Sequence, residues 1–234
     1  MGDFFERKLS GNYGVRSPYK RNAVKSDLSY TSILIGVNVA FFMLFFVMLM
    51  FVDEGLLISW IALMPSVILN GSNVWTFVTS MFMHAGFGHL LVNMVSLMFI
   101  GNFVEKLIGK KRFISLYFAG GLFAGLFFVL IALATGSDLN VYAVGASGAI
   151  FALGGLLAVL TPRLPVLVFF VIPMPMWAAM GVLMFGLWAL SLGLGLPIGN
   201  TAHLGGLLVG VGYGFYLKKK FPRKTAMISK YFSK

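Results

Sequence analysis

The chain has 234 residues, of which 59% are hydrophobic and only 11% are charged, and its net charge is +11. Because a soluble domain is about 25% charged, this composition excludes a soluble globular protein and indicates an integral membrane protein. The chain has no cysteine, which excludes disulfides and thiolate metal sites. We expect no nucleic-acid partner, because the basic residues lie in short stretches beside apolar runs, where they orient a chain in the bilayer.

Six apolar stretches follow a polar and basic N-terminal tail, Met1–Ser29, which we expect to be flexible or bound to a surface. A hydrocarbon core of about 30 Å needs about 20 helical residues. The expected spans are approximately Tyr30–Val52, His89–Leu107, Phe113–Ala134, Ser147–Leu160, Met176–Leu194 and Ala202–Leu217. The predicted domains are therefore a tail over 1–29, a six-helix membrane domain over 30–217 and a basic tail over 218–234.

The positions of Lys and Arg support six spans. Six of the 18 lie in the N-terminal tail, four between spans two and three, one between spans four and five, and seven after span six. The opposite loops carry Asp53, Glu54 and Asp138 without a basic residue. Since cytoplasmic loops hold the excess of Lys and Arg, both termini are expected in the cytoplasm. The predicted fold class is an all-α polytopic membrane protein.

Two connections are unusual. The first outer loop, Gly55–Met83, has no charge but contains Trp60 and Trp75, so we expect it to lie partly in the outer leaflet. The stretch Leu164–Pro175 is apolar but is interrupted by three prolines, which argue against a continuous helix. It is expected to be an ordered connection on the inner side.

Ser147, in Gly145-Ala146-Ser147-Gly148, can be a helix N-cap, or a nucleophile whose small neighbours let a substrate backbone approach. Spans two, four and six all enter from the outer side, which places His89, Asn93, Ser147 and His203 at similar depth. Each of these side chains alone can be a packing contact between helices. Polar groups inside a membrane are costly and usually functional, so their convergence favours a site.

No carboxylate is placed to complete a catalytic triad. Asp53, Glu54 and Asp138 are in loops, and Glu105 is at the far end of span two. The residues therefore predict a serine–histidine dyad, in which the histidine must be held by packing. Phe151, one turn below Ser147 on the same helix face, is the candidate ring.

These residues resemble the rhomboid intramembrane serine proteases over approximately Tyr30–Leu217. The order and spacing of four motifs agree with that family. They are Gly145-Ala146-Ser147-Gly148 for Gly-x-Ser-Gly, Ala202-His203-Leu204-Gly205-Gly206 with Gly210 for Ala-His-x-x-Gly-x-x-x-Gly, His84–Asn93 for His-x-x-x-x-His-x-x-x-Asn, and Gly101–Gly109 for Gly-x-x-x-Glu-x-x-x-Gly. The implied fold is a six-transmembrane-helix rhomboid-like bundle.

The resemblance implies that Ser147 is the nucleophile and His203 the general base of a serine endopeptidase. It further implies that His89, Asn93 and the backbone N–H of Ser147 donate to the oxyanion. The supporting positions are Phe151, His84, Glu105, Gly145, Gly148 and Gly206. The implied reaction is hydrolysis of peptide bonds in or near transmembrane segments of other proteins, without a metal or cofactor. The expected partners are these substrates and the lipid bilayer.

We expect this multi-pass protein in the cell (plasma) membrane, with its active site opening toward the outside. Two positions depart from the family pattern. Trp75-Thr76 stands where the family often has Trp-Arg, and Phe151 stands where it often has Tyr. The second change keeps a ring against the histidine but removes its hydroxyl. Neither position takes part in proton or acyl transfer.

Glycines are expected to let two spans approach closely. Gly206, Gly210 and Gly214 form a smooth stripe on span six, and Gly154 and Gly155 on span four are the expected counterparts. Span five and the loop after it, with Gly193, Gly195 and Gly199, are the candidate moving parts for lateral substrate entry.

Two other function classes remain open. One is an inactive relative that binds or escorts membrane proteins, although such relatives typically lose the serine or the histidine. The other is a small transporter, against which we find no inverted repeat and no acidic residue in the outer half of a span.

Overall fold

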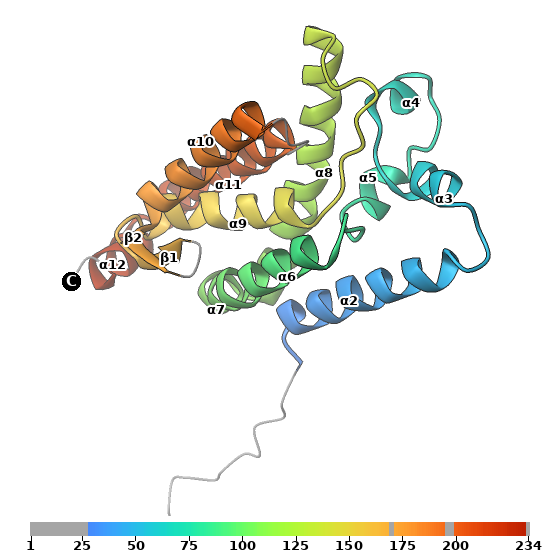
Figure 1. Ribbon diagram of the computed structural model, residues 1–234. Coiled ribbons are helices and arrows are strands. Elements are labelled where there is room, and N and C mark those ends of the chain that lie inside the picture. The colour runs from blue at the N-terminus through green and yellow to red at the C-terminus, as the bar shows by residue number, and fades with distance from the viewer. Residues whose placement is uncertain (1–27, 169–170, 195–198, 233–234) are drawn as a thin grey trace, which may run out of the picture.

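The computed structural model describes residues 28–168, 171–194 and 199–232, so most of the expected N-terminal tail and Gly195 lie outside the described residues. The described chain is mostly helical, with one two-stranded hairpin (Figure 1). Its elements are α2 (Tyr30–Met48), α3 (Glu54–Ile61), α4 (Pro65–Leu69), α5 (Thr76–Thr79), α6 (Phe87–Ser96), the π-helical η1 (Leu97–Gly101), α7 (Asn102–Ile108), α8 (Lys110–Thr135), α9 (Ser147–Leu160), β1 (Pro165–Val168), β2 (Ile172–Pro175), α10 (Met176–Leu194), α11 (Asn200–Lys220) and α12 (Pro222–Tyr231).

Helix α9 forms the centre of the molecule. Twelve of its 14 residues are buried, as expected for a helix that is apolar on every side. It packs against α8, α10, α11 and the segment η1. At 1.5 Å per residue α9 is about 21 Å long, which is shorter than a hydrocarbon core of about 30 Å. Helix α9 alone is therefore too short to reach both surfaces of the membrane.

Four helical segments are long and apolar enough to cross a membrane. They are Tyr30–Met48, Phe87–Ile108, Lys110–Thr135 and Met176–Leu194. Helix α9 has only 14 residues, and α11 is rich in glycine and ends in three lysines. The architecture is thus a helical membrane bundle in which two shorter or less apolar helices pack among four candidate spans.

The first helix is shorter than expected. α2 ends at Met48 rather than at Val52, because the chain turns through Leu49–Val52 and Asp53 then caps α3. The Asp53 carboxylate accepts a hydrogen bond from the N–H of Leu56 at 3.0 Å. An aspartate at this position starts a new helix rather than extending the old one.

One end of the bundle gathers most of the described basic residues. The Lys110 ammonium donates to the carbonyl of Leu28 at 3.1 Å, which joins the start of α8 to the residue before α2. The Arg112 guanidinium lies 5.4 Å from the ring centre of Phe221, at the end of α11. Because these contacts join the start of α8 to the start of α2 and to the end of α11, we call this end the basic end.

Glu105 connects α7 to the start of α2 at the basic end. Its carboxylate accepts hydrogen bonds from the N–H groups of Tyr30 and Thr31, both at 2.9 Å, and from the Thr31 hydroxyl at 2.8 Å. A carboxylate is favourable at a helix N-terminus, where backbone N–H groups lack intrahelical partners. The sequence singled out Glu105, and the structure gives it this contact.

The connection after α9 is a β-hairpin. Its register pairs Pro165 with Pro175 and Leu167 with Pro173. In an antiparallel ladder alternate pairs exchange hydrogen bonds, and all three prolines belong to the same set of pairs. Their missing N–H groups therefore leave the bonds of the other pairs intact, which reconciles a proline-rich stretch with strand structure.

The uncharged stretch Gly55–Met83 lies in a loop that folds into three short helices, α3, α4 and α5, which side-chain hydrogen bonds connect. The Trp75 indole donates to the carbonyl of Trp60 at 2.8 Å, and the two indoles lie 5.7 Å apart. The Thr79 hydroxyl donates to the carbonyl of Ile61 at 2.7 Å, and the Asn73 amide donates to that of Ser59 at 2.9 Å. Both tryptophans remain exposed, by 58% and 45%, and indoles are side chains that a bilayer interface favours.

Candidate active site

Ser147 and His203 meet at the start of two helices. The serine hydroxyl lies 2.8 Å from Nε2 of His203, although the two residues are 56 positions apart. Ser147 is the first residue of α9 and His203 lies in the first turn of α11. The sequence left two readings of Ser147 open. The structure places Ala146 rather than Ser147 at the N-cap of α9, and the serine hydroxyl lies against the imidazole.

The imidazole of His203 is held by packing on one face. Phe151 stacks on it with ring centres 4.6 Å apart and planes 15° from parallel. His203 is 8% exposed, and its Nδ1 has no hydrogen-bond partner among the described residues. No carboxylate therefore contacts the ring within the described chain.

Close approach of α9 and α11 makes the serine–histidine contact possible. A Cβ at Gly206 would overlap the carbonyl oxygen of Gly148, and one at Gly210 would overlap that of Ala152. Gly155 faces the backbone of α11 from the other side, where a Cβ would lie 2.6 Å from the carbonyl oxygen of Leu207. Glycine is required at these positions because any side chain would separate the two helices.

One expected glycine contact was wrong. Gly154 does not face α11, since a Cβ there would meet Met180 of α10, with its sulfur at 2.6 Å. Consecutive residues of a helix point about 100° apart. Gly154 and Gly155 therefore cannot both face α11, and they serve two different neighbours. Gly214 does lie on the α11 stripe, against Val159 of α9.

Gly145 brings His89 close to the start of α9. Its φ of +117° is a conformation that side chains disfavour, and a Cβ would lie 2.9 Å from the imidazole of His89. The N–H of Gly145 donates to the carbonyl of Ser80 at 2.8 Å, which anchors this turn to the outer loop. His89 thus lies beside the segment that carries Ser147.

Asn93 lies one turn further along α6 and is buried. One of its amide N–H groups donates to the carbonyl of His89 at 2.8 Å. The Nδ1 of His89 accepts from the N–H of Ala85 at 3.4 Å. Within the described part of the chain, no hydrogen bond joins His89 or Asn93 to Ser147. The structure therefore unites Ser147 with His203 directly and places His89 and Asn93 nearby without a direct contact to the serine.

His84 lies before α6, outside the membrane-spanning segment. Its Nδ1 lies 3.2 Å from the carbonyl of Phe82, and its ring centre is 5.1 Å from that of His89 in an edge arrangement. Burial, together with the nearby His89, lowers the pKa of His84 to about 4. A neutral His84 imidazole therefore packs against His89 at neutral pH.

The loop between α2 and α6 includes Asn73 and Thr79, which sequence reasoning missed, as well as Thr76, which it named. Thr76 replaces the arginine of the family pattern, and its hydroxyl donates to the carbonyl of Asn73 at 2.7 Å. Asn73 and Thr79 secure the short helices of this loop. Asn73 has a positive φ of 50°, and its place in the turn-forming stretch Asn70-Gly71-Ser72-Asn73 is the signal that could have found it.

No group of three or more His, Asp or Glu side chains that could hold a metal ion occurs in the part of the chain described here. The chemistry that this arrangement can perform rests on a hydroxyl, an imidazole and hydrogen-bond donors. The fold and the site thus define a helical membrane protein in which a partly buried serine contacts a buried histidine at one end of the bundle.

The Rhomboid domain, as a family model, matches residues 71–220. Rhomboid protein 1, mitochondrial, of Saccharomyces cerevisiae is 37% identical over 148 residues, which are 60% of this chain and 41% of that protein. "Putative rhomboid protease YdcA" of Bacillus subtilis is 37% identical over 81 residues, 35% of this chain and 38% of that one. "Inactive RHOMBOID-like protein 8" of Arabidopsis thaliana is 36% identical over 73 residues, 31% and 19% respectively.

The chain belongs to the rhomboid family, since the family match covers more than half of its length. It is an integral membrane protein. It spans less than half the length of the curated relatives that it matches. The matched range contains the four motifs on which the sequence resemblance rests.

Proposed function

We propose that the protein is an intramembrane serine endopeptidase, with Ser147 as nucleophile and His203 as general base. The observation that carries the proposal is the 2.8 Å contact between the serine hydroxyl and Nε2 of the buried histidine. A nucleophile within hydrogen-bond reach of a base is the minimum arrangement for covalent acyl transfer. Family membership supports the same activity.

The reaction begins when Oγ of Ser147 attacks the carbonyl carbon of the scissile peptide bond and its proton passes to Nε2 of His203. The tetrahedral intermediate collapses as His203 returns that proton to the leaving nitrogen. Water then attacks the acyl-enzyme, His203 accepts the water's proton and gives it to the departing serine oxygen, and the acid is released. Nε2 can act as the base only when the neutral imidazole carries its hydrogen on Nδ1.

The negatively charged oxygen of the tetrahedral intermediate needs hydrogen-bond donors. The backbone N–H of Ser147 is at a helix start, where N–H groups lack intrahelical partners and the helix field favours an anion. We assign His89 and the second amide N–H of Asn93 as side-chain donors to this oxygen. Both residues belong to α6, and His89 lies beside Gly145. Removing one oxyanion donor typically costs about 10²–10³ in kcat.

We further propose a six-span topology, with a membrane domain over 30–217, tails over 1–29 and 218–234, and both termini in the cytoplasm. The clustering of Lys and Arg at the basic end supports this orientation. It would place Ser147 toward the outer side of a cell membrane, below the surface because α9 is short. The substrates are then transmembrane segments of other proteins, which must unwind locally to expose a peptide bond.

An inactive relative that binds membrane proteins is the second candidate, because one similar protein carries that description. The presence of both Ser147 and His203 in contact favours the protease. In the experiment, the purified full chain is reconstituted with a model transmembrane substrate and cleavage is followed by mass spectrometry. We expect cleavage by the unaltered chain and by Ser115→Ala, an exposed control serine, but none by Ser147→Ala. Absence of cleavage by the unaltered chain on a panel of such substrates would favour the binding protein.

A further inference from the structure

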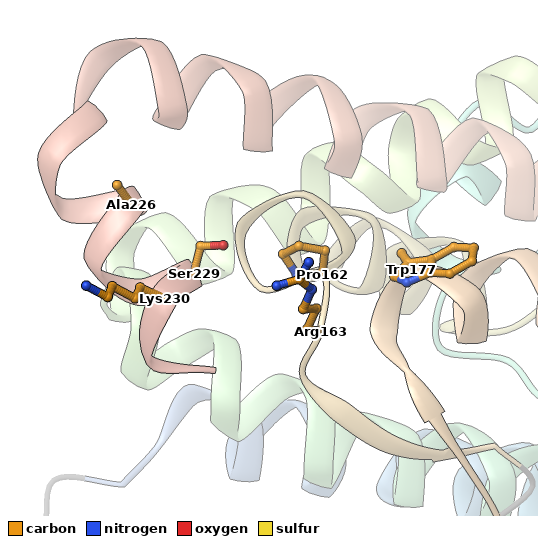
Figure 2. Close-up of a pocket in the computed structure, with 6 residues that line it drawn as sticks. All are labelled: Pro162, Arg163, Trp177, Ala226, Ser229 and Lys230. Carbon is orange, nitrogen blue, oxygen red and sulfur yellow. The ribbon is translucent and has the colours of Figure 1, made fainter. Parts of the chain in front are cut away.

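Polar side chains at the two ends of α9 and α11 differ in their access to water. At the basic end, a cavity of about 600 Å³ between α12 and the turn after α9 is lined in part by Arg163 and Lys230 (Figure 2). Both residues are exposed, and Figure 2 shows the Lys230 ammonium directed away from Arg163. At the start of α11, in contrast, two polar atoms are enclosed by protein. They are Nδ1 of His203 and the amide oxygen, Oδ1, of Asn200, and neither has a hydrogen-bond partner within the described residues.

Helix capping, the ordinary role of an asparagine at a helix start, does not explain Asn200. The residue is 5% exposed and is the first residue of α11, while Gly199 occupies the N-cap. A capping asparagine accepts a hydrogen bond from a backbone N–H of the first turn, but Oδ1 of Asn200 accepts none in the part of the chain described here. A buried acceptor without a donor is unfavourable. Its presence beside the candidate active site therefore points to a role in the reaction.

The proposed reaction requires a hydrogen on Nδ1 of His203. Nε2 lies 2.8 Å from the Ser147 hydroxyl and is the atom that accepts its proton, so Nδ1 carries the hydrogen of the neutral imidazole. Phe151 stacks on the ring with planes 15° from parallel. This contact fixes the plane of the imidazole but neither its rotation within that plane nor its tautomer. A hydrogen-bond acceptor at Nδ1 would fix both.

The helix places the two unpartnered atoms on the same side of α11. Residues three positions apart have Cβ atoms about 5–6 Å apart, and side chains of a helix lean toward its N-terminus. The backbone N–H of His203 donates to the carbonyl of Gly199 at 3.0 Å, so the helical spacing holds between these residues. The imidazole therefore leans toward the turn that begins with Asn200. Catalytic hydrogen bonds are often long or misaligned without substrate and tighten when it binds.

We propose that Asn200 is a positioning residue, whose amide oxygen accepts the Nδ1–H of His203 when a substrate is bound. This inference rests on the proposed function, and it adds a neutral third side chain to the serine–histidine pair. The amide holds the imidazole in the tautomer that activates Ser147, and its oxygen stabilises the imidazolium that forms during acyl transfer. Because the amide is uncharged, it avoids the cost of a carboxylate inside the membrane.

The test measures the rate at which a fluorophosphonate labels Ser147 and the cleavage of a model transmembrane substrate, both with the full chain in detergent. Asn200→Ala removes the acceptor. We expect its labelling rate and kcat to fall about tenfold, the size of one lost hydrogen bond, while KM changes less than about twofold. The matched control is Thr201→Ala, which truncates the next residue of the same turn and should change both rates less than about twofold. Melting temperatures verify that each variant is folded.

Asn200→Asp keeps an acceptor and adds a negative charge near His203, so it separates a role in the reaction from a role in packing. A carboxylate favours the charged imidazolium, which cannot act as the base. The acidic limb of the pH–rate profile for labelling should therefore move to higher pH by about one unit. Above this limb, Asn200→Asp should label Ser147 faster than Asn200→Ala. A residue that only packs would change the melting temperature and leave the pH profile in place.

The outcomes distinguish this inference from the proposed function. If the unaltered chain is labelled on Ser147 and Asn200→Ala is labelled at the same rate, the proposed function stands and the role of Asn200 is overturned. Equal losses in Asn200→Ala and Thr201→Ala would also overturn it, as would an effect of Asn200→Ala on KM alone, which indicates a contact with substrate. A pH profile of Asn200→Asp that coincides with that of the unaltered chain would contradict it too. Absence of labelling in the unaltered chain would overturn both proposals.

Discussion

The two ends of the helix pair α9 and α11 differ in the kind of polar side chain that lies there and in how far it is buried. At the starts of the helices, uncharged polar side chains are half-buried or buried and contact one another, as Ser147 does His203. At their far ends, charged side chains are exposed and the buried carboxylate of Glu105 is satisfied by backbone N–H groups. The proposed chemistry needs the burial at one end, and the exposed charges at the other end suit a membrane surface.

The comparison predicts that variants at the two ends separate activity from stability. Changes near Ser147 should lower cleavage more than they lower stability. Changes at the basic end should lower stability and leave the cleavage rate per folded molecule unchanged.

Gly206→Leu should have the largest effect, because a side chain there overlaps the carbonyl of Gly148 and separates α9 from α11. We expect destabilisation of about 3 kcal/mol and loss of cleavage. Thermal unfolding and a cleavage assay measure both. Gly212→Leu on the same helix is the control, since a Cβ there meets nothing within 4 Å. Equal melting temperatures for Gly206→Leu and the unaltered chain would contradict the close packing.

Phe151→Ala should remove the ring that positions the His203 imidazole. We expect a loss of about 3 kcal/mol in stability from the cavity and a fall in kcat that exceeds any change in KM. Phe151→Tyr keeps the stacked ring, 4.6 Å from the imidazole, and should retain most of the activity. If Phe151→Ala and Phe151→Tyr had the same kcat, the ring would have no positioning role.

Glu105→Gln tests the basic end of the bundle. The change weakens three hydrogen bonds to a carboxylate at the start of α2, and we expect about 2 kcal/mol lower stability. The cleavage rate per folded molecule should be unchanged, because Glu105 is far from Ser147. Glu54→Gln, at an exposed position, serves as the control with little change. A specific loss of kcat in Glu105→Gln would show that the two ends are coupled.

His84 should make stability depend on pH. Its folded-state pKa of about 4 is below the unfolded value of 6.5, so the unfolded chain binds more protons between these values. Its contribution is therefore complete above pH 6.5 and is lost as the pH falls toward 4. We expect a change on the order of 1 kcal/mol, measured as the difference in melting temperature between the unaltered chain and His84→Gln. A difference that does not vary with pH would contradict the neutral, buried imidazole.

The sequence predicted the bounds of a helix correctly where helix-breaking residues lie at its ends. α9 and α10 have the predicted limits, because Thr161-Pro162 ends the first and Pro175 precedes the second. Hydrophobicity alone predicted that the first helix continues to Val52. In the structure α2 ends earlier, and Asp53 caps the next helix, α3. The prolines of Leu164–Pro175 excluded a helix but did not reveal the hairpin, since strand pairing depends on register rather than on composition.

The meeting of Ser147 and His203 was predictable from topology, because two spans that enter from one side start at one depth. The contacts that position them were less accessible. Gly154 was assigned to the wrong neighbour, since a helix face can be judged only when the orientations of both helices are known. The hydrogen bonds of Thr79 and Asn73 join parts of the loop 14 to 18 positions apart, and no local pattern indicates them.

The central claim is that Ser147 is an activated nucleophile, and covalent labelling tests it most directly. The full chain in detergent is treated with a fluorophosphonate, and the adduct is located by peptide mapping. We predict a single adduct on Ser147, its loss in His203→Ala with the melting temperature retained, and slower labelling in His89→Ala. An adduct on another serine, or undiminished labelling of Ser147 in His203→Ala, would contradict the account.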